Sequence, residues 1–88
     1  MVPTDLSESE AVNTLADDLG IRLIRDILYH ASLQGLSSKD LTRRMGVPSS
    51  TVTTAFRSPS MITLQWLAQA CCALGLEAEL AFRPTCRD

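Results

Sequence analysis

The stretch from Ser37 to Phe56, SSKDLTRRMGVPSSTVTTAF, decides which fold this chain can adopt. Ser37 or Ser38 can cap a helix, and Gly46 sits where helices commonly end in a left-handed residue. Pro48 fits the start of a second helix, where its missing N–H has no partner to lose. The stretch therefore predicts two short helices joined by a tight turn.

Such a unit can place its second helix in the major groove of DNA. That helix carries short hydroxyl side chains, which donate and accept hydrogen bonds and so can pair with several bases. A solvated polar face is the alternative explanation of this composition. The candidates for base contact are Ser49, Ser50, Thr51, Thr53 and Thr54. The positions predicted to face inward across the two helices are Leu41, Thr42, Met45, Val52 and Ala55, with Phe56 as a further candidate.

The charge of the chain is unevenly distributed. The net charge is −2, yet residues 21–76 carry six basic side chains against two acidic ones. Residues 1–20 carry five acidic side chains and no basic one. Local field matters more than net charge for an encounter with phosphate, so the basic centre favours DNA as a partner. The candidates for phosphate contact are Ser38, Lys39, Arg43, Arg44 and Arg57.

Helical patterns continue on both sides of this unit. An acidic helix is predicted before Gly20, with apolar residues at Val12, Leu15 and Leu19 that either pack on their own domain or bind a partner. Gly20 either breaks this helix or only weakens it, since an interior glycine costs about 1 kcal/mol. After the turn at 57–60, Thr63 is predicted to cap a further helix that Gly75 ends. Its apolar stripe is Leu64, Leu67, Ala68, Cys71 and Leu74, and Trp66 is assigned to the core.

The C-terminal part changes period. Apolar residues alternate with more polar ones over about seven positions, which predicts a strand ended by Pro84. A lone strand has unpaired edges, so we expect it to pair with the same strand of a second copy, or else to lie on its own helices. The residues on the apolar face of this dimer strand are Leu76, Ala78, Leu80 and Phe82.

The residues 37–52 resemble the lambda-repressor/Cro-like (XRE) helix-turn-helix family. Its members run hydroxyl-Gln-x-x-Leu-Ala, then apolar-Gly-Val-Ser, then small polar residues. Residues 63–76 resemble the fourth helix of that family, so the resemblance covers roughly residues 21–76. Ser38 stands in place of the usual Gln and Thr42 in place of Ala. The usual long Arg or Gln side chains that read bases are also absent.

This resemblance implies an all-α bundle of about five helices followed by a short C-terminal β-strand. Residues 1–20 would be an acidic helical extension, 21–76 the helix-turn-helix domain, and 77–88 the strand and tail. The ending also resembles small HigA-type antitoxins, which implies an autoregulating repressor that binds double-stranded operator DNA as a homodimer and pairs with a cognate toxin. The alternatives are a solitary or phage-type regulator and a protein-interaction module of the same fold without DNA binding.

Other classes of protein find no support in the sequence. No signature joins a nucleophile to a base, so we expect no enzyme and no cofactor. His30 has no further ligand at metal-binding spacing. The three cysteines are interpreted as free thiols in a reducing cytoplasm. We expect neither a secretory signal in the polar N-terminus nor a membrane span, since no apolar run approaches about 20 residues.

Overall fold

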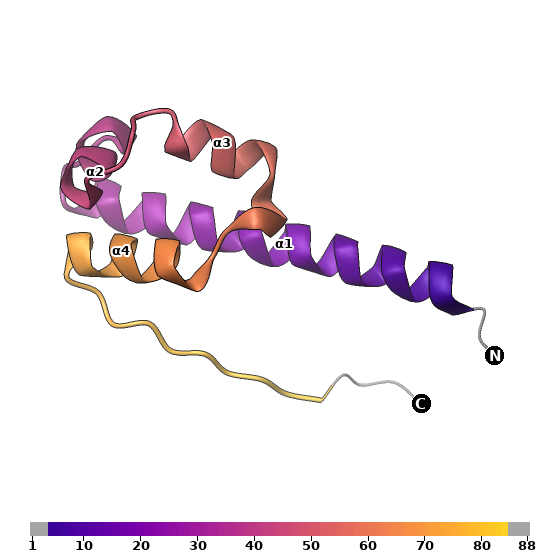
Figure 1. Ribbon diagram of the computed structural model, residues 1–88. Helices are drawn as coiled ribbons and strands as arrows, with labels where there is room; N and C mark the ends of the chain where they lie inside the picture. Colours follow the sequence, from indigo (N-terminus) through magenta and orange to yellow (C-terminus); the bar gives the residue numbers. More distant parts are fainter. Residues whose placement is uncertain (1–3, 85–88) are drawn as a thin grey trace.

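The computed structural model describes residues 4–84, with side chains from residue 9 onward (Figure 1). All its regular secondary structure is helical. The elements are α1 (Thr4–Leu33), α2 (Ser38–Met45), α3 (Thr51–Arg57), the short 3-10 helix η1 (Pro59–Met61) and α4 (Leu64–Leu74). The prediction of a helical chain is confirmed. A fifth α-helix and a strand are not formed within the described residues. No helix among them is both long enough and apolar enough to cross a membrane.

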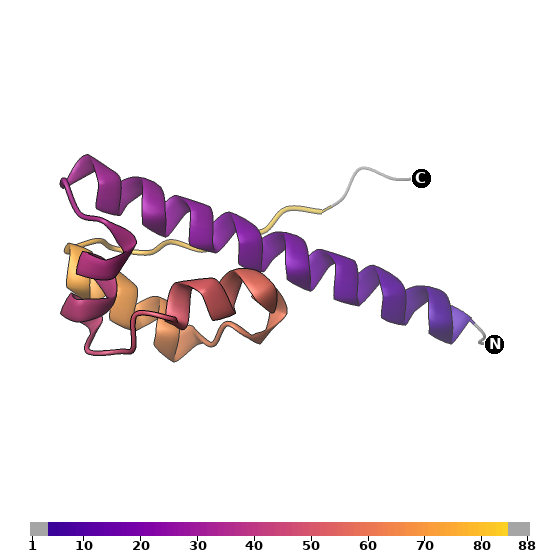
Figure 2. The same cartoon turned by 90° about the horizontal axis from the view of Figure 1, so that it is seen from above.

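The missing fifth helix has a simple cause: α1 continues through Gly20 instead of breaking there. The acidic N-terminal segment and the first helix of the bundle are therefore one rod of 30 residues. Figures 1 and 2 show that the shorter elements gather along the C-terminal half of α1, while its N-terminal half extends beyond them.

Gly20 lies buried at the place where η1 crosses α1. A Cβ built on Gly20 would come within 2.6 Å of the carbonyl carbon of Pro59 and 2.8 Å of its Cβ, and closer still to its carbonyl oxygen. Real Cβ atoms do not approach other atoms so closely. The glycine is thus needed for contact between two backbones, and its cost in helix propensity is offset by that contact.

Helix boundaries agree with the caps predicted from the sequence. The Ser37 hydroxyl accepts a hydrogen bond from the Asp40 N–H at 3.1 Å, and the Asp40 carboxylate accepts one from the Ser37 N–H at 3.0 Å, which completes a capping box. Gly46 ends α2 in the left-handed region at φ 74°. The Thr63 hydroxyl accepts from the Trp66 N–H at 3.0 Å at the start of α4, which Gly75 ends at φ 69°.

The capping box predicts a pH dependence of stability. Hydrogen bonds from Ser37 lower the pKa of Asp40, with a smaller contribution from the charge of Arg43. A carboxylate whose folded pKa lies below its unfolded value stabilises the fold above that unfolded value, about 3.9, and loses this effect as pH falls through the folded pKa. We expect Asp40→Asn to lower the melting temperature at pH 7. Under strong acid, the melting temperatures of the variant and of wild type should differ less. Thermal melts across pH would reveal this, and a constant difference would contradict it.

The core lies between the C-terminal half of α1, α2 and α4. It contains Leu41 and Met45 from α2, and Thr42 beside them is also buried, as the sequence predicted. Val52 and Ala55 attach α3 in the same way, whereas the further candidate Phe56 is exposed. Part of the α4 prediction is wrong, because Leu64 and Ala68 are exposed and Ala70 is buried instead. The remaining buried apolar residues are Ile24, Ile27, Ala31, Cys71 and Leu74.

The predicted strand over residues 76–83 does not form in the single chain. Residues 76–84 leave α4 as an extended segment (Figure 1); Leu76 packs partly buried against the core, and residues 77–84 are exposed. A strand requires a hydrogen-bonded neighbour, and no other part of the described chain is extended. The alternative that this segment lies on its own helices holds for Leu76 alone, since Leu80 and Phe82 remain exposed.

Candidate nucleic-acid interface

The turn between α2 and α3 is held by local hydrogen bonds. The Val47 N–H donates to the Thr42 carbonyl at 3.0 Å, beside the left-handed Gly46. Pro48 lies in a turn before α3, because the Thr51 N–H donates back to the Pro48 carbonyl at 3.0 Å. The second helix therefore begins at Thr51, three residues later than the position of Pro48 suggested.

The outward face of α3 carries most of the predicted base-contacting residues. Helical spacing sets Ser50, Thr53 and Arg57 opposite the buried Val52 and Ala55, and Thr54 borders the same face. All four outward residues, Ser50, Thr53, Thr54 and Arg57, are exposed. This face is polar: it carries short hydroxyl side chains along its length and the positive charge of Arg57 at its C-terminal end.

A shallow hollow of about 240 Å³ lies on α2 and the turn that leads into α3. Lys39 and Arg43 lie one turn apart on α2, and both line the hollow together with Ser49 from the following turn. Arg43 also makes an ion pair with Asp40 at 3.4 Å, but both side chains are exposed, so this pair holds the guanidinium only weakly. The structure thus brings two predicted phosphate contacts and one predicted base contact around a single hollow, whose lining also includes Val47.

Three predicted contact residues lie apart from this group. Arg44 faces α4, where its guanidinium donates to the Ala73 carbonyl at 3.4 Å near the C-terminal end of that helix. Ser38 is exposed at the start of α2, whose cap is its neighbour Ser37. Thr51 is half-buried and turned toward α4. Sequence spacing places these side chains on their own helices, but it does not say where α4 lies.

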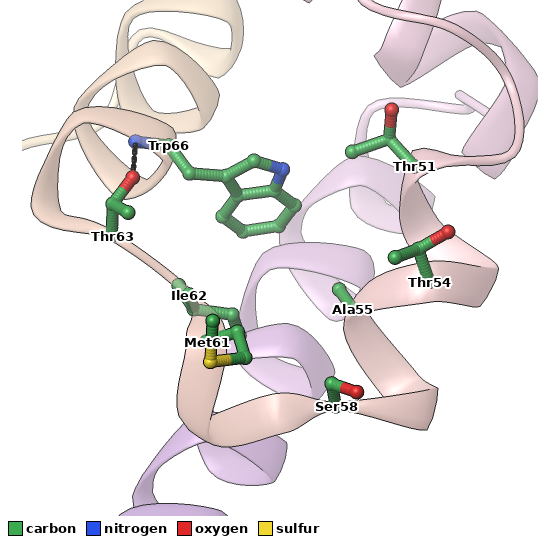
Figure 3. Close-up of a pocket in the computed structure, with 8 residues that line it drawn as sticks. All are labelled: Thr51, Thr54, Ala55, Ser58, Met61, Ile62, Thr63 and Trp66. Atoms are coloured by element: carbon green, nitrogen blue, oxygen red, sulfur yellow. Dashed lines mark hydrogen bonds between the residues drawn. The ribbon is translucent and has the colours of Figure 1, made fainter.

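A second, more apolar pocket of about 250 Å³ separates α3 from the start of α4 (Figure 3). Thr51 and Thr54 lie on one side and Trp66 on the other, with the indole ring directed toward α3. The Trp66 Nε1–H is buried and has no hydrogen-bond partner among the described residues. Trp66 packs against the core as predicted, and it also forms a pocket wall that no sequence signal indicated. The remaining lining residues are Ala55, Ser58, Met61, Ile62 and Thr63.

Comparisons with protein-family models, with curated proteins and with solved structures find no match for this chain. The arrangement must therefore be interpreted from its own chemistry. Exposed hydroxyls on a short helix, next to clustered cations and free of any acidic side chain on α3, suit an anionic and hydrogen-bonding partner.

Proposed function

We propose that this chain is a sequence-specific DNA-binding protein of the lambda-repressor-like (XRE) type, in which α2 and α3 act as a helix-turn-helix. The observation that carries this proposal is the exposed hydroxyl face of α3 together with the hollow lined by Lys39, Arg43 and Ser49, which directly precedes Ser50 in the chain. In this arrangement α3 enters the major groove, where its hydroxyls meet base edges. Lys39, Arg43 and Arg57 neutralise phosphates on either side.

A dimer on two half-sites completes the proposal. A single copy offers few phosphate contacts and only short side chains to bases, so its affinity would be weak and would fall quickly with salt. The exposed alternating segment 76–83 supports pairing with a second copy as a strand. The biological role that fits best is repression of the protein's own promoter as the antitoxin of a toxin–antitoxin pair, with a solitary or phage-type regulator as the other setting.

A second candidate function is a protein-interaction module of the same fold that binds no DNA. The net charge of −2 and the exposed apolar residues on the N-terminal half of α1 favour it. Binding of the neighbouring gene product without binding of DNA would identify this function.

Fluorescence anisotropy with duplexes from the region upstream of the gene tests DNA binding. We expect wild type to bind an upstream duplex more tightly than a scrambled one. Lys39→Ala with Arg43→Ala should weaken binding to both duplexes, and the slope of log affinity against log salt should fall by about 2, since each phosphate contact contributes about 0.9. The double variant removes positive charge without touching the buried core.

A charge-matched control is Arg22→Ala with Arg25→Ala, because both arginines are exposed on α1 outside the motif. The control should retain the wild-type salt slope. The proposal fails if wild type shows no salt-dependent binding, or if the Lys39 and Arg43 variant behaves like this control.

A further inference from the structure

The N-terminal half of α1 presents an apolar stripe that no other part of the described chain covers. We call residues 9–19 the α1 arm. Val12, Leu15 and Leu19 are spaced three and four apart and so share one side of the arm. Their exposed fractions are 63%, 58% and 49%, so the arm does not bury this stripe in its own domain. Three large aliphatic side chains in one row mark a surface for docking.

The C-terminal segment 76–84 is the second open surface, with Leu80 71% and Phe82 92% exposed. Figures 1 and 2 both show that this segment runs back from α4 toward the end of the molecule from which the α1 arm extends. Both surfaces are apolar, and only another strand can pair the open backbone of the segment. The segment has an apolar face and unpaired backbone edges, while the arm has apolar side chains and no unpaired backbone.

We propose that two copies of this chain form one interface from these surfaces. The segments 76–83 pair as an antiparallel two-stranded ribbon centred on Leu80, and the apolar face of the ribbon packs on the stripes of both α1 arms. This inference rests on the dimer of the proposed function. It adds the pairing register of the two segments and the helices that cover the ribbon.

The side chains select the register. With Leu80 opposite Leu80 of the second copy, Glu77 lies opposite Arg83 at both ends of the ribbon, and the small Ala78 lies opposite the large Phe82. A shift of the centre to residue 79 would set two glutamates directly against each other, which is destabilising. In the favoured register the missing N–H of Pro84 falls at the end of the ladder, where it is tolerated.

The ribbon needs a cover because two strands alone are not stable in water without packing against a helix. The apolar face carries Ala78, Leu80 and Phe82 from each copy, and the opposite face carries Glu77, Glu79, Ala81 and Arg83. The stripe from Val12 to Leu19 spans about 10 Å along the helix. The apolar residues of one strand span about 13 Å, so one arm per copy matches the face in length.

Charge reversal tests the register by sedimentation equilibrium of the full chain. We expect wild type to dimerise. Glu77→Arg alone and Arg83→Glu alone should each raise the dimer dissociation constant about tenfold, because each converts two attractive pairs into repulsive ones. The double variant should return the constant to within about threefold of wild type, since it restores both pairs in swapped order. A monomeric wild type, or a double variant no better than the singles, would overturn the register.

The cover is tested by Leu15→Glu with Leu19→Glu, which places charge on the stripe without entering the domain core. We expect this variant to be monomeric at concentrations where wild type is dimeric, while its thermal melt remains cooperative. Leu64→Glu is the matched control, because Leu64 is 77% exposed on α4 and lies off both surfaces. A stripe variant that stays dimeric, or a control that becomes monomeric, would overturn the cover.

These readouts are separate from DNA binding. If both tests give the expected results and the chain binds no DNA, the interface stands and the proposed DNA-binding function fails. A chain that binds operator DNA as a monomer loses only the interface.

Discussion

Gly20→Ala is expected to lower the free energy of unfolding by about 2–3 kcal/mol, even though alanine is the better helix former. The new methyl group would meet the backbone of Pro59, with 2.6 Å to the carbonyl carbon, and backbone cannot swing aside as a side chain can. Relief requires η1 to move away from α1, and η1 leads directly into α4. For a domain with about 4–13 kcal/mol of total stability, this loss is large.

Differential scanning calorimetry should register this loss as a fall in melting temperature of about 10–20 °C. Asn13→Ala is the matched control, because Asn13 is exposed on the same helix and gains helix propensity without a new contact. The control should melt at or slightly above the wild-type temperature. A Gly20→Ala protein at least as stable as wild type would show that η1 does not rest on α1 in the way described.

The helix boundaries could be predicted because their causes are local. The capping box joins Ser37 to Asp40 across three positions, and Gly46 and Gly75 end their helices through their own backbone freedom. The buried residues of α2 could be predicted for the same reason, since their spacing alone separates inside from outside. Such features require no knowledge of the rest of the fold.

The role of Gly20 could not be predicted, because it depends on Pro59, which lies far along the chain. From sequence alone, an interior glycine is equally compatible with a break and with a close contact. The prediction for the C-terminal segment fails for a different reason: its alternation indicates a strand, but residues 4–84 contain no second extended segment with which it could pair. In both cases the outcome depends on contacts with distant residues, which the hydrophobic periodicity of a segment does not specify.

The sequence predicted which helix carries each candidate site residue, but not the direction in which each side chain points. Ser50, Thr53 and Thr54 are exposed as the pattern suggested, while Thr51 turns toward α4 and Arg44 donates to a carbonyl of α4. The position of α4 relative to the motif decides both outcomes. The convergence of Lys39, Arg43 and Ser49 on one hollow likewise depends on the path of the turn, which spacing does not specify.

Ser50→Glu with Thr53→Glu is expected to weaken operator binding by at least about 100-fold while leaving the fold intact. Two carboxylates on the outward face of α3 would meet base acceptors and the phosphate field, and like-charge contacts at an interface cost several kcal/mol. The same carboxylates lie at the N-terminus of a helix, where negative charge is favourable by about 0.3–1 kcal/mol. Binding and stability should therefore change in opposite directions.

The measurement that tests DNA recognition by α3 most directly pairs the operator affinity and the melting temperature of this variant with those of a charge-matched control. The control is Ser9→Glu with Thr14→Glu, both exposed on the α1 arm and outside its apolar stripe. We predict that the α3 variant melts no lower than wild type and loses operator binding, while the control loses less than about fivefold, as expected for distant, screened charges. Equal loss in both variants, or unchanged affinity in the α3 variant, would contradict recognition of DNA by this helix.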